Sequence, residues 1–293
     1  GIYLLGGKPI NFHKLLPGNL EKCHQKFIKI ILGLNRYTPI IGLYGETGQY
    51  PLAIEMIASS LKYLQRLKTA PTDSLLHTSF QESLKMKKKD CMNFNLKILN
   101  FNDFQPSKVS VHKVVQNLQN RFRSFWHEQL HNDAGREHGN KLRHYRNIKH
   151  HFGKENYLTS INQRALRKQL ANLRLSSHRL NIETGRYTQG QGRLPPDQRF
   201  CNKCNLKKCE DEFHFIIECP YYNATRDTMV TTMTERLNFI SNYDKIEIYN
   251  WLISNQDDFV NINLAKFVGS FPKTKPIITH HIKCVLHRPH IST

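Results

Sequence analysis

The chain has 293 residues, of which 43 are Lys or Arg and 23 are Asp or Glu, so its formal net charge is +20. This length suits one large domain or two ordinary ones, and the 16 Phe and 12 Tyr argue against disorder along the whole chain. So large a positive excess favours a polyanionic partner over a merely soluble basic surface, and no apolar run approaches the roughly 20 residues that cross a bilayer.

The first residues, Gly-Ile-Tyr-Leu-Leu, lack the basic start and the small-residue cleavage site of a secretory leader. We therefore expect a reducing compartment, nuclear or cytoplasmic. The chain starts with Gly rather than Met and enters directly into sequence with ordered patterning. We expect it to be a fragment of a longer protein.

The first strong pattern, in residues 20–34, repeats apolar residues every three or four positions and predicts a helix that ends near Gly33 and Asn35. The residues expected to face its core are Leu20, Cys23, Phe27, Ile30, Ile31 and Leu34. A turn-rich stretch is predicted next, marked by Pro39, Gly42, Gly45 and Gly48.

Pro51 is suited to the first turn of a second helix, which we expect to run to about Thr69 and to pack against the first. Its predicted buried residues are Ile54, Ile57, Leu61 and Leu64. Residues 70–105 are weakly patterned, and we interpret them as a linker or insertion with a solvated lysine cluster.

Three further helices are predicted in the middle of the chain. A long amphipathic one spans residues 111–130, and a short one lies within 142–152. A third covers 161–173, with Ser160 as a candidate N-cap. Strand-like alternation is nearly absent, so the expected fold class is mostly α, with a small Cys/His zinc knuckle.

We expect six segments along the chain. They are a helical segment at 1–70, a linker or insertion at 71–105, a basic helical region at 106–198, a zinc-binding segment at 199–225, C-terminal helices at 226–271 and a disordered tail at 272–293.

Positive charge is concentrated between residues 141 and 199, which hold thirteen Lys and Arg against three acidic residues. Tyrosines and histidines are interleaved with these cations, and flat rings next to cations suit nucleic-acid bases and phosphates. A solvated helical surface would explain many of the same charges. We expect non-specific contact with RNA or DNA here, without any base preference.

Four of the seven cysteines lie between residues 201 and 219. Cys201 and Cys204 form a Cys-x2-Cys pair, and His214 and Cys219 are spaced so that one helical turn directs both inward. In a reducing compartment this spacing predicts tetrahedral zinc with three sulfurs and one nitrogen. Four protein ligands leave no position for water, so the ion is expected to be structural. Cys209 is left out, although its exchange with Cys204 or Cys219 stays open.

With these residues identified, the chain resembles the region after the polymerase domain of non-LTR (LINE-like) retrotransposon reverse transcriptases. The similarity lies in Leu-Arg-Leu-Ser-Ser-His-Arg from Leu173, in Asp-Gln-Arg-Phe-Cys-Asn-Lys-Cys from Asp197 and in Glu-Asp-Glu-Phe-His-Phe-Ile-Ile-Glu-Cys-Pro-Tyr-Tyr from Glu210. Upstream, Leu-Tyr-Gly-Glu-Thr-Gly-Gln-Tyr-Pro-Leu from Leu43 is similar to the segment that joins thumb and tail in that family.

The resemblance implies that Cys201, Cys204, His214 and Cys219 bind zinc and that the basic region holds template RNA or target DNA. By charge alone, the candidate nucleic-acid contacts are Arg164, Arg167, Arg174, Arg179 and Arg186. Polymerisation needs a Tyr-x-Asp-Asp type carboxylate pair to hold magnesium, and this sequence has none. Its one Asp-Asp, Asp257-Asp258, is expected to cap or precede a helix.

The sequence therefore predicts a catalytically incomplete piece of a reverse transcriptase that binds zinc and nucleic acid. The alternative is a zinc-stabilised protein-interaction domain whose charge serves solubility. A phosphate cradle at Gly42, Gly45 and Gly48 is disfavoured, because no Gly-Lys-Ser/Thr follows. A second metal site in the His-rich tail and a nuclease centre after Cys219 are weaker alternatives still.

Overall fold

A computed structural model describes residues 12–85, 111–132, 140–187, 194–233 and 244–271. Helices dominate these residues, and no strand forms among them beyond two isolated bridges, which confirms the mostly α class. The predictions for the tail at 272–293 and for residues 86–105 lie outside the described residues.

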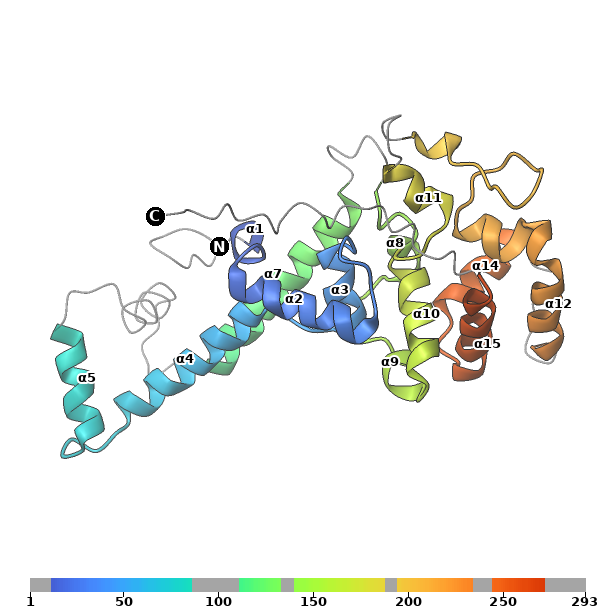
Figure 1. Ribbon diagram of the computed structural model, residues 1–293. Coiled ribbons are helices and arrows are strands. Elements are labelled where there is room, and N and C mark those ends of the chain that lie inside the picture. The colour runs from blue at the N-terminus through green and yellow to red at the C-terminus, as the bar shows by residue number, and fades with distance from the viewer. Residues whose placement is uncertain (1–11, 86–110, 133–139, 188–193, 234–243, 272–293) are drawn as a thin grey trace, which may run out of the picture.

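The N-terminal part forms an elongated group of helices, with α5 at its far end (Figure 1). Its α-helices are α1 (Phe12–Leu15), α2 (Asn19–Leu32), α3 (Ile40–Thr47), α4 (Leu52–Lys68), α5 (Leu75–Lys85) and α7 (Val111–His131). Helix α4 packs on α2 and α7 and buries all four residues predicted for its inner face. Residues 75–85, expected within a linker, are helical.

The remaining part gathers short helices around α10, with the C-terminal helices on its outer side (Figure 1). Its α-helices are α8 (Tyr145–Ile148), α9 (Tyr157–Ser160), α10 (Arg164–Arg174), α11 (Asn181–Thr184), α12 (Asn223–Thr232), α14 (Lys245–Ser254) and α15 (Asp258–Gly269). Short helical turns are η1 (Gly185–Tyr187), η2 (Pro196–Gln198), η3 (His214–Glu218) and η4 (Pro220–Tyr222). Helix α15 packs along α10, which ties the C-terminal helices to the basic region.

Helix α2 is where predicted, but the prediction of its core-facing side is wrong. Glu21, Gln25, Ile28 and Leu32 are its buried residues. The side chain of Gln25 donates to the carbonyl of Leu16 at 3.0 Å, and the hydroxyl of Tyr44 donates to Glu21, so polar groups inside are satisfied. The apolar side of the helix is exposed instead, at Leu20, Phe27, Ile30 and Ile31.

The glycine-rich stretch predicted as turns is the helix α3. Its glycines allow close helix packing: a Cβ atom at Gly45 would lie 2.7 Å from Nε1 of Trp126, and one at Gly42 would lie 2.8 Å from Leu175. The Trp126 indole donates to the carbonyl of Ile41 at 2.9 Å. Gly48, at φ +65°, ends the helix in the left-handed region that glycine favours.

Of the two helix N-caps predicted from the sequence, one is present and the other is not. Asp257 caps α15 as expected, since its carboxylate accepts from the backbone N–H of Phe259 at 2.8 Å. Ser160 does not cap α10, because it is the last residue of α9 and Gln163 precedes α10. The hydroxyl of Ser160 instead donates back to the carbonyl of Asn156 at 3.0 Å.

Candidate metal centre and basic groove

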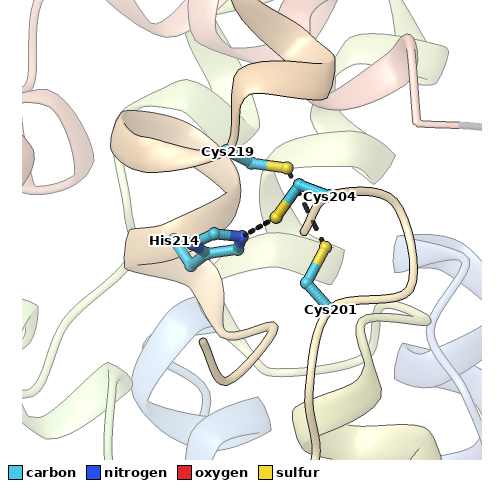
Figure 2. A group of neighbouring side chains, drawn as sticks. All are labelled: Cys201, Cys204, His214 and Cys219. Carbon is cyan, nitrogen blue, oxygen red and sulfur yellow. Dashed lines mark hydrogen bonds between the residues drawn. The ribbon is translucent and has the colours of Figure 1, made fainter. Parts of the chain in front are cut away.

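The first two candidate ligands lie in a tight loop between residues 200 and 209. An isolated antiparallel bridge pairs Phe200 with Cys209, and the backbone N–H of Cys201 donates to the carbonyl of Lys208 at 2.8 Å. Lys207 turns the chain at φ +51°. This closure places the side chains of Cys201 and Cys204 on the same side of the loop (Figure 2).

The other two ligands lie on a single π-helical turn, His214–Glu218, and directly after it. The backbone N–H of Cys219 donates to the carbonyl of His214 at 2.7 Å, which ends the turn. Phe215 and Ile216 are buried in the core and anchor this turn. The wide turn brings His214 and Cys219 to the same centre, where they face the cysteine loop (Figure 2).

The four ligand atoms lie within 4.8 Å of one another and form a Cys3His cluster that could hold a metal ion. The sulfurs of Cys201 and Cys219 are 3.8 Å apart, and the sulfur of Cys204 is 3.4 Å from Nε2 of His214. A zinc ion about 2.3 Å from each sulfur would give tetrahedral edges of roughly 3.8 Å. The spacing therefore fits one tetrahedral ion, with His214 presenting Nε2.

Groups around the cluster orient its ligands. Nδ1 of His214 lies 3.4 Å from one carboxylate oxygen of Glu218. The other oxygen of Glu218 forms an ion pair with Lys208 at 2.6 Å. The backbone N–H of His214 donates to Asp211 at 2.8 Å. A carboxylate behind the free nitrogen of a ligating imidazole is the usual way in which its orientation and tautomer are held.

Burial raises the pKa of the Cys201 thiol to about 12 and raises that of Cys219 as well. Metal binding there would displace the thiol protons.

Cys209 lies outside the cluster. Its thiol donates to the carbonyl of Pro196 at 3.3 Å. Among the described residues, the four predicted ligands are the one group of this kind. The His-rich tail, where a second site was considered, lies outside the described residues.

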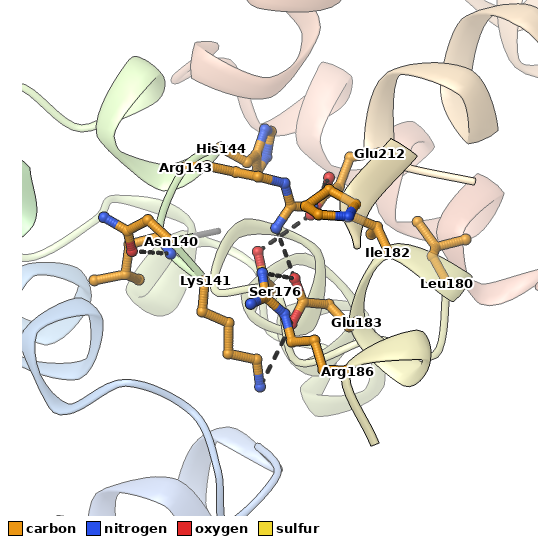
Figure 3. A network of polar contacts seen from close by, with 12 residues as sticks. Asn140, Lys141, Arg143, His144, Ser176, Leu180, Ile182, Glu183, Arg186 and Glu212 are labelled. Carbon is orange, nitrogen blue, oxygen red and sulfur yellow. Dashed lines mark hydrogen bonds and ion pairs between the residues drawn. The ribbon is translucent and has the colours of Figure 1, made fainter. Parts of the chain in front are cut away.

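Two buried glutamates, Glu210 and Glu212, attach the segment that carries the Cys3His cluster to the basic region. Neither was predicted as a functional residue. Glu212 accepts from Arg143 at 2.7 Å and from the Ser176 hydroxyl at 3.1 Å (Figure 3). It also accepts from Nε2 of His178 at 2.8 Å. These charged partners hold the pKa of the Glu212 carboxyl well below its usual range against the effect of burial. Glu210 accepts from the backbone N–H of Asn181 at 2.9 Å. The sequence did contain a signal for these two residues, because acidic side chains between the two pairs of candidate ligands are unusual in so basic a chain.

The structure corrects the expectation for two of the five candidate arginines. Arg174 is 3% exposed, and its guanidinium contacts Glu46 at 2.7 Å and Glu155 at 2.8 Å. Arg186 is 8% exposed and pairs with Glu183 at 2.9 Å. A buried guanidinium that already neutralises carboxylates is not available to a phosphate, so both residues are structural.

The other three candidates lie nearer the surface. Arg164 and Arg179 are exposed, and Arg167 is partly exposed with its guanidinium donating to the carbonyl of Ile161 at 2.6 Å. Arg164 and Arg167 line one groove, and Arg179 is not among its lining residues.

This groove, which we name the basic groove, has a volume of about 630 Å³. Its lining residues are Ile31, Leu32, Thr47, Gln49, Lys154, Leu158, Arg164, Arg167 and Lys168. Four of these are cations, and none is acidic. The first five residues of α10 contribute three of the cations, so the positive end of the helix dipole adds to their field.

The cations of the basic groove differ from those in the ion-pair networks. Within the described parts of the chain, the side chains of Lys154, Arg164 and Lys168 form no ion pair. The aliphatic part of Lys168 lies over Gly33, where an added Cβ would come within 2.5 Å of it. Backbone packing thus positions Lys168 without neutralising it.

None of the described helices is long and apolar enough to cross a membrane. Comparisons of the chain with protein-family models, with curated proteins and with solved structures found no match.

Proposed function

We propose that this chain is a zinc-stabilised module that binds nucleic acid through its phosphates, and that it derives from the tail of a non-LTR retrotransposon reverse transcriptase. The descent is supported by the sequence resemblance alone. The binding activity is supported by the charge and placement of side chains in the basic groove. The proposed role of the metal centre is to stabilise the segment of residues 201–219.

One observation carries the binding proposal: four cations converge on a groove whose lining contains no carboxylate. Elsewhere, basic side chains such as Arg143 and Arg174 are paired with glutamates. Cations gathered without acidic partners repel one another, and a polyanion relieves that repulsion while releasing its own counterions. Phosphate contacts of this kind carry no sequence information, so binding is non-specific.

We infer that the ion is zinc and that its role is structural. Three thiolates and an imidazole form a soft donor set of the kind that selects zinc, and they fill a tetrahedral shell without leaving a position for water. Purified protein should contain one zinc per chain by elemental analysis. Its near-ultraviolet circular dichroism should be lost on chelation and recovered with added zinc. Unchanged spectra after complete metal removal would contradict a structural ion.

Synthesis of nucleic acid is not part of the proposed function. The carboxylate pair needed for two-metal catalysis is missing from the sequence. The single Asp-Asp pair acts in the fold: Asp257 caps α15, and Asp258 accepts from the hydroxyl of Ser160.

The binding proposal is tested by charge reversal inside and outside the basic groove. The test variant is Arg164→Glu with Lys168→Glu. Its matched control is Lys113→Glu with Lys245→Glu, which changes the net charge equally at exposed residues that do not line the groove. Affinity for a labelled oligonucleotide is measured by fluorescence anisotropy between about 50 mM and 200 mM salt.

We expect the groove variant to lose affinity far more than the control, together with part of the salt dependence. The wild-type dissociation constant should rise steeply with salt, because counterions are released on binding. Equal losses in both variants would show that only net charge matters. Affinity that does not change with salt would rule out phosphate contacts.

A second candidate function, protein interaction, is favoured by the exposed apolar side of α2. Leu20, Phe27, Ile30 and Ile31 are each at least half exposed. An apolar stripe of this kind is more common at interfaces than on free surfaces. If the groove variant bound oligonucleotides as well as wild type does, this candidate would be preferred.

A further inference from the structure

Two tyrosines from distant parts of the sequence stack on each other at the surface. The ring centroids of Tyr37 and Tyr187 are 5.5 Å apart, and their planes differ by 26°. Tyr37 is 51% exposed and Tyr187 is 53% exposed, so about half of each side chain stays open to solvent. The other stacked pair of described rings, Tyr222 with Phe271, belongs to the interior.

The tyrosine pair is held in place by the loop between α2 and α3, which lies against the residues that follow α10. The backbone N–H of Asn35 donates to the hydroxyl of Ser177 at 2.7 Å, and the Thr38 hydroxyl contacts the same oxygen at 3.1 Å. The side chain of Asn35 accepts from the N–H of Tyr37 at 3.0 Å. A platform ordered before binding loses little entropy when a ligand stacks on it.

Three cations surround Tyr37. The guanidinium of Arg36 lies 4.5 Å from the ring centroid. The ammonium of Lys29 donates to the carbonyl of Arg36 at 2.7 Å, and that of Lys141 to the carbonyl of Tyr37 at 3.4 Å. Burial lowers the pKa of Lys29, and the charge of Lys141 lowers it further, so these two ammonium groups repel each other.

The nearest carboxylate does not cancel this charge. Glu183 lies 3.8 Å from Lys141 but also pairs with Arg143 at 2.6 Å and with Arg186 at 2.9 Å (Figure 3). Because Arg143 also pairs with Glu212, two carboxylates are shared among three cations, which still leaves an excess of positive charge beside the stacked rings. An anion bound next to Tyr37 would relieve it.

The α2–α3 loop also connects the tyrosine pair with the basic groove. At one end of this loop, Gly33 lies under Lys168 and its carbonyl accepts from Asn172 at 3.3 Å. Toward its other end, Tyr37 stacks on Tyr187. Tyr37 follows Gly33 by only four positions, which is at most about 14 Å of extended chain. A flexible strand could therefore reach both places.

We propose that Tyr37 and Tyr187 form a stacking platform for an unpaired base, so that the partner of this module is single-stranded nucleic acid. The inference rests on the proposed nucleic-acid binding and specifies it further. Aromatic rings bind every base through its π face, whereas a base inside a duplex is covered by its neighbours. Arg36 and Lys141 supply positive charge beside the pair for the phosphates that flank the base.

The experiment compares four labelled ligands of equal length: oligo(dT), oligo(rU), an abasic strand with the same phosphates, and a duplex. Each is titrated into wild type and into Tyr37→Ala, Tyr187→Ala, Tyr37→Phe and Tyr187→Phe. Tyr63→Ala is the matched control, because Tyr63 is 56% exposed on α4 and belongs to neither surface. Zinc content and circular dichroism verify that each variant is folded.

We expect each of the two alanine variants to bind oligo(dT) and oligo(rU) about fivefold or more weakly, as loss of one stacked base predicts. The phenylalanine variants and Tyr63→Ala should bind these strands like wild type. The abasic strand should bind weakly to wild type and should not distinguish the variants. The duplex should bind less tightly than either single strand.

The platform would be disproved if the alanine variants lost equal affinity for abasic and base-containing strands, or if they lost none. Equal affinity of wild type for duplex and single strand would disprove the preference for unpaired bases. In each of these cases a persisting salt dependence would leave the proposed function standing. Absence of binding to all four ligands would overturn both proposals.

Discussion

Basic side chains of the same types occur in two different settings in this molecule. In the ion-pair networks of Arg174 and Arg143 they are neutralised by glutamates, whereas in the basic groove they gather without carboxylates. Around α10, Arg174 lies inside a network with Glu46 and Glu155, and Arg143 connects Glu183 with Glu212. At the other end of the same helix, Arg164 and Lys168 open into a groove without acidic residues. On α10, the exposed Arg164 and the buried Arg174 are ten positions apart.

This difference shows that the charge of a segment does not identify its partner. What distinguishes the two regions is whether carboxylates from elsewhere in the chain reach the cations. Glu46 comes from α3, and Glu212 comes from the segment that carries the Cys3His cluster. Buried ion pairs of this type contribute little net stability when intact, yet their disruption is costly, because it leaves a buried charge without a partner.

The largest effect is expected for Arg174→Ala. Removal of this guanidinium leaves Glu46, which is fully buried, and Glu155 without their main partner. The free energy of unfolding should fall by about 3–5 kcal/mol, as measured by urea denaturation of the zinc-loaded protein. Arg164→Ala is the matched control on the same helix and should change it by less than about 0.5 kcal/mol. Similar losses in the two variants would remove the distinction between the regions.

A smaller loss, about 2–3 kcal/mol, is expected for Glu212→Gln. The amide keeps the shape but removes the charge that pairs Arg143 and His178. Because Glu212 lies two residues before His214, zinc dissociation measured with a chromogenic chelator should also be faster. Glu82→Gln is the control, since the Glu82 pair on α5 is exposed. Unchanged stability and unchanged zinc release would show that the metal segment is not held through this carboxylate.

The pH dependence of stability should reveal a third kind of basic group, buried and neutral. Burial lowers the pKa of His144 to about 4, and the hydroxyl of Tyr249 lies 2.7 Å from its Nδ1. Between pH 6.5 and about 4, His144 is protonated in the unfolded chain but stays neutral in the folded chain. The free energy of unfolding therefore falls as the pH falls through this range.

Replacement of this histidine by glutamine should therefore flatten the profile. Between pH 6.5 and 5, wild type should lose roughly 1–2 kcal/mol more stability than His144→Gln. Chemical denaturation in excess zinc at each pH measures the difference. Parallel profiles for the two proteins would mean that His144 takes up its proton over the same pH range in the folded and unfolded states.

The smallest effect on stability is expected in the basic groove. Arg164→Ala with Lys168→Ala should leave the free energy of unfolding within about 0.5 kcal/mol of wild type. The slope of log affinity for a single strand against log salt should nevertheless decrease by about 1.4, because two phosphate contacts are lost. A stable variant with an unchanged slope would place the phosphate contacts elsewhere.

Much of the local structure follows from the sequence alone. The apolar repeats predicted α2, α4, α7 and α10, and the paired spacing of Cys201 with Cys204 and His214 with Cys219 predicted a cluster that the structure brings together. Such features depend on residues within one or two turns of each other. Their periodicity and spacing are therefore readable without knowledge of the rest of the chain.

The tertiary structure determined which side chains are buried and which distant segments are in contact. It buried Arg174 and Arg186, turned the apolar side of α2 outward and made a helix of a glycine-rich stretch whose glycines admit Trp126 and Leu175. It also brought Tyr37 to Tyr187 and Glu46 to Arg174 across more than a hundred residues. Burial, ion pairing and close packing depend on which distant segment arrives at a given surface, and no local pattern contains that information.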